Sequence, residues 1–395
     1  MTTLATWSPG CGGSPSLGGA VACAEDSFLP VTGATPLGTR SLAPREPADA
    51  FRVLEPGYVQ VQLEPVDACV QVVHATDELD AELITLDGAR TFCRDCPERT
   101  ALLRGGGLLG IPTDAGELGA FVDAQLGLRS CATLGPAPDE PGRVEARLSH
   151  WPLGDLGVPP TARGVLRVDL LVLGESFLGR DGRTALAAAW VQQAEALLTD
   201  ARLRLDLHAV CVLDADAADA AGLTVEAGDA SEAESALDHA RASCPGFAPS
   251  AEDPRITVIY APCLRFHDPL FATTSTLDGY TTHVPGGFAP AGVADAVLLG
   301  GGCELPRGLD ADGLPLGLAR DLAHELGHYL GLFHSVEADG ETVDTLDDTD
   351  GADLMNARPS LASARGLSPT QVRVVRAHPA VRWPRAGQEA CADPH

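Results

Sequence analysis

The chain has 395 residues, which is long enough for two domains and needs no crosslinks to bury a core. All 27 basic residues are arginine, and the absence of lysine excludes Walker-type phosphate loops, protein kinases, pyridoxal enzymes and Schiff-base aldolases, which require that side chain. A formal net charge of −28 argues against nucleic acid or an anionic membrane as a partner, and no apolar run is long enough to span a bilayer.

The first part of the chain predicts a flexible segment followed by a small all-β domain. Residues 1–50 are rich in Gly, Pro and Ala and lack apolar periodicity, which is typical of an extended lead-in. From 51 to 150, apolar and polar residues alternate in short runs, as at Val59, Val61 and Leu63. We therefore expect a β-sandwich accessory domain at 51–150, either a retained module or a removed pro-segment, with a role in binding, docking or shielding.

The cysteines indicate an oxidising compartment. Eleven of them scatter through both halves, which favours up to five disulfides and a protein that is secreted or attached to the cell envelope, although no secretion signal is visible in the first 22 residues. Cys93 and Cys96 form an isolated CxxC pair, for which disulfide bonding is a simpler interpretation than a zinc knuckle. Cys11 is a candidate lipid-anchor site, and the alternative is a plain flexible tether.

Residues 160–384 predict an α/β domain with a mixed, twisted sheet. The apolar run from Val165 to Leu173 predicts a strand, the spacing of apolar residues from Leu186 to Leu198 predicts a helix, and the alternation from Leu203 to Leu207 predicts a second strand. A strand, a helix and a strand in this order form a βαβ unit with a parallel pair.

The rest of this domain adds strands and helices to the same sheet. Two further strands are expected at Ile256–Tyr260 and Ala296–Leu299, with a short edge strand between Thr273 and Pro290. Ser368 followed by Pro369 predicts the start of a C-terminal helix that runs to about His378, and residues 385–395 are expected to form a tail.

One motif carries the candidate chemistry. His324 and His328 are four residues apart, so on a helix both imidazoles point to the same side. Gly331 stands where the helix must end and the chain must turn with positive φ, which brings His334 round as a third nitrogen ligand. Three imidazoles leave Zn²⁺ one open position for water, as in catalytic sites, and Glu325 projects beside the metal rather than onto it.

These residues resemble the extended zinc-binding motif of the metzincin metalloproteases, and Ser335 after the third histidine is similar to the matrixin version. The resemblance implies a zinc-dependent endopeptidase over about residues 160–384, with Met355 as the methionine of the turn beneath the metal. The interval from His334 to Met355 is longer than in matrixins, and Ala357 stands where astacins and serralysins have a metal-bound tyrosine.

A stretch rich in carboxylates follows the third histidine. Asp344, Asp347, Asp348 and Asp350 repel one another unless they are solvated or neutralised, so a Ca²⁺ site is one interpretation and a solvated acidic surface is the other. A further alternative concerns Cys11, whose thiolate could occupy the open zinc position as in a cysteine switch.

The expected mechanism is hydrolysis of a peptide or protein substrate by water that the metal activates, with Glu325 as general base. The substrate is expected to lie extended along the edge of the sheet as an added strand. Two alternatives stay open: a non-enzymatic surface or adhesion protein with a metal-bearing, protease-like domain, and a zinc hydrolase that acts on something other than peptides.

Overall fold

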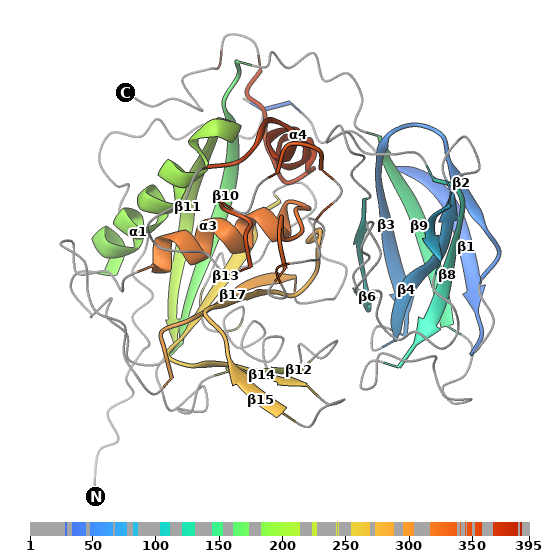
Figure 1. Ribbon diagram of the computed structural model, residues 1–395, viewed down its shortest axis with the longest axis horizontal. Coiled ribbons are helices and arrows are strands. Elements are labelled where there is room, and N and C mark those ends of the chain that lie inside the picture. Colours follow the sequence, from blue (N-terminus) through green and yellow to red (C-terminus); the bar gives the residue numbers. More distant parts are fainter. Residues whose placement is uncertain are drawn as a thin grey trace, which may run out of the picture.

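The computed structural model describes part of the chain, in segments separated by gaps: residues 28–29, 34–44, 48–65, 68–76, 82–85, 103–110, 121–130, 144–152, 161–173, 183–213, 223–226, 242, 244, 254–268, 273–287, 295–303, 317–337, 340, 344, 346–349, 352–357, 366–385 and 388. In Figure 1 the strands before residue 153 lie on one side of the molecule, and the remaining strands with all labelled helices lie on the other. Cys11, Cys93, Cys96 and Asp350 lie outside the described residues.

Two sheets form the N-terminal part. Their strands are β1 (Thr35–Leu42), β2 (Phe51–Val53), β3 (Gly57–Glu64), β4 (Cys69–Thr76), β5 (Glu82–Thr85), β6 (Leu103–Arg104), β7 (Gly106–Leu109), β8 (Phe121–Arg129) and β9 (Val144–Pro152). One sheet has the order β1-β9-β3-β7 and the other β2-β8-β4-β5, with β6 paired to β4. Both contribute to one apolar core, for example Val59 and Val61 from the first and Val70 and Val72 from the second. We refer to these strands as the N-terminal sheet pair.

Strand β1 lies inside the segment for which the sequence predicted no regular structure. Its residues pair with β9 from Thr35 opposite His150 to Leu42 opposite Val144. Most of its side chains are exposed or half-buried, and only Leu42 is buried. The strand is therefore held by backbone pairing with a neighbour about a hundred residues away in the sequence. Because its side chains lie largely outside the core, its sequence shows no alternation of apolar and polar residues.

The C-terminal part is built on a five-stranded sheet of the order β11-β10-β13-β17-β16. The elements of this part are β10 (Gly164–Leu173), α1 (Arg183–Leu197), the 3₁₀ turn η2 (Thr199–Ala201), β11 (Leu203–Leu213), β12 (Leu223–Glu226), β13 (Ile256–Ala261), β14 (Leu264–Asp268), β15 (Thr273–Thr276), β16 (Gly279–Thr281), β17 (Ala296–Gly300), α3 (Leu318–Tyr329) and α4 (Pro369–Ala377). The first four strands of the sheet are parallel, and β16 pairs with β17 antiparallel at the edge. The predicted strand–helix–strand unit is confirmed as β10, α1 and β11.

Both faces of this sheet are covered. Leu166 and Leu170 on β10 belong to a core that also contains Trp190 of α1 and Leu322 of α3. Leu171 on β10 points the other way, into a second core. Burial on both faces explains why β10 is a nearly continuous apolar run. In Figure 1, α1 and α3 lie together on one face of the sheet.

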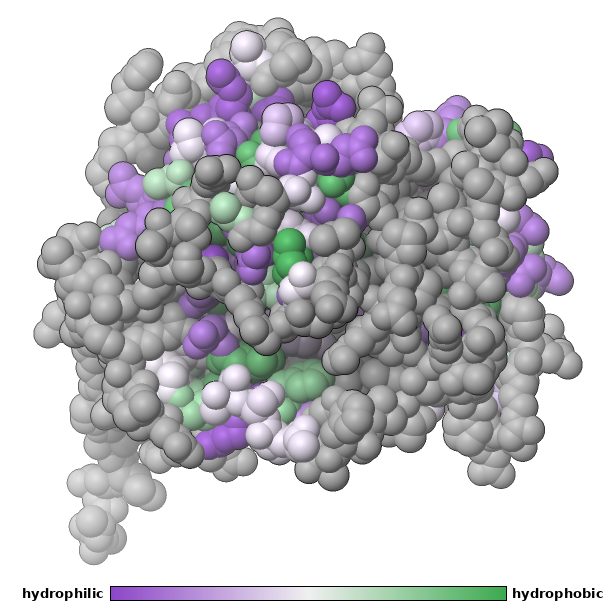
Figure 2. Space-filling model, viewed as in Figure 1, coloured by the Kyte–Doolittle hydropathy of each residue, from purple (hydrophilic) through white to green (hydrophobic). Residues whose placement is uncertain are grey.

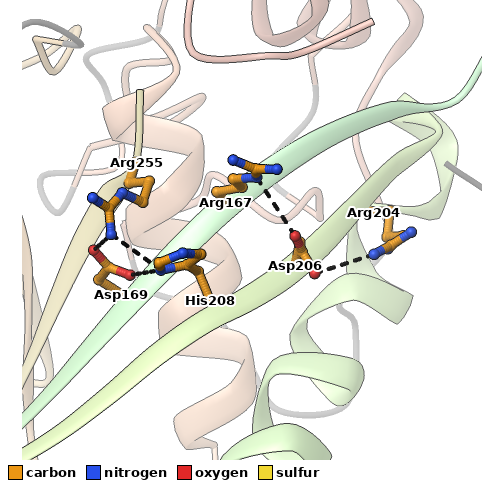
Figure 3. A network of polar contacts seen from close by, with 6 residues as sticks. All are labelled: Arg167, Asp169, Arg204, Asp206, His208 and Arg255. Atoms are coloured by element: carbon orange, nitrogen blue, oxygen red, sulfur yellow. Dashed lines mark hydrogen bonds and ion pairs between the residues drawn. The ribbon is translucent and has the colours of Figure 1, made fainter. Parts of the chain in front are cut away.

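Two polar residues, Arg167 and Asp169, interrupt the apolar run of β10, and Figure 3 shows both. Asp169 on β10 is fully buried, and its carboxylate is bonded to Arg255 Nη1 at 3.0 Å and to His208 Nδ1 at 3.0 Å. The pairing of β10 with β11 shifts between Val168 and Asp169, so His208 is the extra residue of a bulge. The bulge turns His208 toward Asp169, and the guanidinium of Arg255 compensates the buried charge, which is a structural role.

Smaller elements complete the C-terminal part. A three-stranded sheet of the order β12-β14-β15 lies apart from the main sheet. Disulfides join Cys211 to Cys244 and Cys263 to Cys303. Helix α4 starts after Ser368, whose hydroxyl accepts from the amide of Gln371 while the Gln371 side chain accepts from the amide of Ser368. This capping box, with Pro369 in the first turn, confirms the predicted C-terminal helix.

Among the coloured residues in Figure 2, hydrophilic and apolar ones are interspersed, and the apolar areas are small. Among the large apolar residues of the described segments, only Leu54 is strongly exposed, at 54%. No helix in the described segments is both long enough and apolar enough to cross a bilayer.

His378, directly after α4, makes stability depend on pH. Its ring is buried, with Nε2 3.0 Å from the carbonyl oxygen of Gly286 and Nδ1 accepting from the amide of Ala380. Burial lowers the pKa of His378 from 6.5 to about 4. Between pH 6.5 and 4 the unfolded chain therefore binds a proton at His378 that the folded chain does not. The free energy of unfolding has its full value above pH 6.5 and decreases as the pH falls to 4.

We expect this histidine to account for about 3 kcal/mol of the stability lost on acidification from pH 6.5 to 4. Glutamine can donate to Gly286 and accept from Ala380 but does not titrate in this range. Urea unfolding at several pH values gives the free energy of unfolding of the parent protein and of His378→Gln. The contributions of all other titrating groups cancel in the difference between the two proteins. Equal pH slopes for the two proteins would contradict the assignment.

Candidate metal centre

Helix α3 carries the first two histidines of the motif. Leu318, Leu322 and Leu326 are buried and pack one side of the helix into the core against the sheet. His324 and His328 are four residues apart and lie one above the other on a different side. Their Nε2 atoms are 3.1 Å apart. Helical geometry alone therefore positions two of the three rings.

The third histidine arrives through a tight bend after the helix. Gly331 has a φ of +103°, a conformation that glycine adopts without steric cost. The amide of Gly331 donates to the carbonyl of His328 at 2.9 Å, and the amide of Leu332 donates to that of Gly327 at 3.0 Å, so the free carbonyls at the helix end are used. The bend places His334 Nε2 3.1 Å from His328 Nε2.

We expect Gly331→Ala to lower the free energy of unfolding by about 1–2 kcal/mol. A Cβ atom at Gly331 would meet its nearest neighbours at 3.5 to 3.7 Å, an ordinary contact distance, so the cost comes from the positive φ and not from a clash. Asparagine tolerates this backbone region better, so Gly331→Asn should lose less. Chemical denaturation of the metal-free proteins measures both, and equal losses for the two variants would count against a backbone origin.

Each imidazole is held in the tautomer that a metal requires. The Nδ1 atoms lie close to oxygens that only accept: Leu354 O at 2.8 Å from His324, Leu332 O at 2.7 Å from His328, and Glu337 Oε2 at 2.8 Å from His334. Each Nδ1 therefore carries the proton, and each Nε2 presents a lone pair.

The three Nε2 lone pairs meet in one place. The ligand atoms of His324, His328 and His334 all lie within 4.8 Å of one another, and they are the one such cluster of metal-binding side chains in the described segments. Burial, and then the neighbouring His334, lower the pKa of His324 to about 4, so this ring is neutral at neutral pH. Tetrahedral Zn²⁺ with bonds of about 2.0 Å requires nitrogens ~3.3 Å apart, close to the observed spacing. The donor set fits Zn²⁺ with one position left open.

Glu325 lies beside this cluster and is not part of it. Its side chain is buried, and the hydroxyl of Thr281 on β16 lies 2.7 Å from Oε2 and 2.9 Å from the Glu325 carbonyl oxygen. Gly279 on the same strand leaves room for the carboxylate, because a Cβ atom there would lie 2.5 Å from Oε1. Burial raises the pKa of Glu325 to about 8, although the hydrogen bond from Thr281 opposes the rise. Such a group can take up and release a proton near neutral pH.

Met355 lies fully buried beneath the helix. A Cβ atom at Gly327, between the first two histidines, would lie 2.4 Å from its sulfur, so helix and methionine are in close contact. The carbonyl of Met355 accepts from the amide of Ser335 at 3.0 Å. The residue predicted to support the metal site therefore contacts both the helix and the segment that carries the third histidine.

A buried carboxylate that the sequence did not single out organises this region. Asp353 Oδ1 accepts from the Ser335 hydroxyl at 2.7 Å and from the Met355 amide at 2.9 Å, and Oδ2 accepts from the Gln371 side chain at 3.2 Å. It thereby ties the third-histidine segment, the methionine turn and α4 together. Its position two residues before Met355 is the only signal of this role in the sequence, whereas nothing in the sequence links Thr281 to Glu325.

The acidic stretch has other bonding partners where it is described. Asp344 Oδ1 accepts from the Thr349 hydroxyl at 2.6 Å, and Asp347 is exposed. Asp348 accepts from the amide of Thr370 at 3.1 Å and so caps the start of α4. Burial raises the pKa of Asp348, but hydrogen bonds from Thr370 and Ser368 outweigh it and lower the pKa overall. Calcium at these residues stays a prediction.

No family model and no curated protein matches this chain. Among solved structures, metalloproteinase-II from Bacteroides fragilis is 14% identical with a TM-score of 0.29, over 59% of this chain and 62% of that one. A family two carbohydrate esterase from Cellvibrio japonicus is 14% identical with a TM-score of 0.13, over 47% of this chain and 52% of that one. The chain spans less than two thirds of the length of either structure. The function proposed below therefore rests on the geometry of the site in this chain.

Proposed function

We propose that this chain is a zinc-dependent endopeptidase similar to the metzincins. The observation that supports this most directly is the convergence of three imidazole Nε2 atoms, each with its Nδ1 engaged elsewhere, next to the buried carboxylate of Glu325. A purely structural metal site has no need of such a carboxylate, which disfavours a non-enzymatic adhesion protein.

The residues of the site have distinct tasks in this proposal. His324, His328 and His334 would hold the metal, and a bound Zn²⁺ supplies Lewis acidity that activates water and polarises a carbonyl. Glu325 accepts the proton of the attacking water and delivers it to the departing amine nitrogen. Thr281 donates its hydrogen bond to one carboxylate oxygen, which holds the carboxylate in place.

The edge of the main sheet offers a place for a peptide. Strand β16 is the terminal strand of the five-stranded sheet and carries Thr281, which contacts Glu325. In the described part of the chain no strand pairs with the free edge of β16. We propose that an extended peptide adds there as a further strand, so that main-chain hydrogen bonds bind it largely independently of its side chains.

Two further parts of the proposal concern architecture and location. We propose that helix α3, the Gly331 bend and the Met355 turn form a metzincin-like catalytic unit, and that the N-terminal sheet pair is a β-sandwich accessory domain. The disulfides Cys211–Cys244 and Cys263–Cys303 favour an extracytoplasmic protein.

The test is hydrolysis of a diverse peptide mixture by the purified full chain, read by mass spectrometry. We expect internal cleavages that disappear with a chelator and return with Zn²⁺. The same protein is assayed on acetylated sugars and simple esters. Cleavage of esters without peptides would identify a zinc hydrolase of another class, and a zinc-loaded protein that cleaves neither substrate would refute the enzymatic proposal.

A further inference from the structure

Part of the outer face of the sheet of β1, β9, β3 and β7 is buried, along the first half of β3 and on β7. Along β3, Val59 and Val61 point into the core between the two N-terminal sheets. Tyr58 and Gln60 alternate with them and point outward, yet they are only 1% and 7% exposed. Leu108 on β7 is 0% exposed, and both it and Tyr58 belong to the core cluster that contains helices α1, α3 and α4. This part of the outer face, around Tyr58 and Leu108, therefore packs on the C-terminal part.

Tyr58 reaches the bend of the metal centre. A Cβ atom at Gly331 would lie 3.6 Å from the Tyr58 hydroxyl oxygen, 3.5 Å from Val374 and 3.7 Å from Pro285. The Tyr58 ring also meets the ring of His378 edge-on, with centroids 5.4 Å apart. Tyr58 therefore fills, together with residues of the C-terminal part, the space directly behind the residue that turns the chain between His328 and His334.

The Tyr58 hydroxyl makes no hydrogen bond to any described residue, although it is buried. The contribution of Tyr58 to the bend thus comes from the space that its side chain fills, the hydroxyl oxygen included, and not from a hydrogen bond. Glycine at 331 has no side chain with which to pack, so the bend is held by its backbone hydrogen bonds and by the side chains that surround it. The N-terminal sheet pair supplies one of those surroundings.

We propose that Tyr58 is a positioning residue for the metal centre, and that the N-terminal sheet pair is a permanent support of the Gly331 bend and not a removable pro-segment. The Tyr58 side chain limits the movement of the bend and so keeps His334 at its distance from His328. This inference rests on the proposed metal site, but not on peptide hydrolysis.

The test compares the Zn²⁺ affinity of metal-free full-length variants by competition with a chromophoric chelator. Tyr58→Ala should weaken Zn²⁺ binding by about tenfold or more, as is usual when a residue that holds a metal ligand in place is replaced. Tyr58→Phe keeps the ring and loses only the hydroxyl oxygen that lies nearest Gly331, so it should weaken Zn²⁺ binding less than Tyr58→Ala does. Phe51→Ala is the matched control, because Phe51 is an equally buried aromatic residue whose ring belongs to the core between the N-terminal sheets.

Phe51→Ala is expected to lower thermal stability while leaving Zn²⁺ affinity within about threefold of the parent. Where an alanine variant fails to fold, Tyr58→Leu and Phe51→Leu form the substitute pair, with the same order of affinities expected. Unchanged affinity in the Tyr58 variants, or equal weakening in the Phe51 variants, would overturn the proposal. A protein that binds Zn²⁺ in this order but cleaves no peptide would refute the proposed function and leave the role of Tyr58 standing.

Discussion

Glu325→Gln is expected to reduce peptide hydrolysis by about 10³-fold while zinc stays bound. Glutamine has nearly the same shape, and its side-chain oxygen can accept the hydrogen bond that the Thr281 hydroxyl gives to Glu325 at 2.7 Å. It cannot take a proton from water. The loss should therefore appear in kcat, whereas metal content measured by atomic absorption should equal that of the parent.

Asp321→Asn is the matched control for this substitution. Asp321 is a carboxylate in the first turn of the same helix, and its charge raises the pKa of Glu325 less than burial does. Its removal should change the rate by about threefold or less, because among the influences on Glu325 its charge comes after burial and the Thr281 hydrogen bond. Retention of more than about a tenth of the activity by Glu325→Gln would rule out its role as general base, since proton transfer by a positioned side chain contributes at least about 10²-fold.

His334→Ala is expected to abolish zinc-dependent hydrolysis and to leave little metal on the protein after dialysis. The two histidines on the helix stay in place, but two imidazoles alone hold zinc far more weakly than three. This substitution distinguishes the contribution of the helix to zinc binding from that of the bend. The helix forms from local sequence, and the bend completes the ligand set. Metal content and activity should fall together.

Glu337→Gln should have a smaller effect of the same kind. Its carboxylate accepts from Nδ1 of His334 at 2.8 Å and fixes that ring, and the loss of such a contact weakens metal binding by about 10–100-fold. Excess zinc should restore activity to Glu337→Gln but not to His334→Ala. His267→Ala is the control, since His267 lies on β14 and its ring contacts Thr274. If removal of His267 costs as much zinc as removal of His334, the assigned ligand set is wrong.

Local sequence determined the parts of the protein that depend on neighbouring residues. The spacing of His324 and His328 required a helix, Gly331 required positive φ, and Ser368 with Pro369 marked the start of α4. The apolar run of β10 likewise predicted a strand, and the structure adds that both of its faces are buried. Each of these follows from backbone geometry within a few residues, so no tertiary contact was needed to predict it.

Only the tertiary structure decided what surrounds the site. Thr281 contacts Glu325, from which it is 44 residues away in the sequence. Tyr58 belongs to the N-terminal sheet pair and lies next to Gly331 of the C-terminal part. Strand β1 shows no apolar alternation because its backbone pairs with β9 while its side chains remain largely outside the core. Such contacts depend on how sheets and helices pack, and the residues that make them carry no periodicity or spacing that a single sequence reveals.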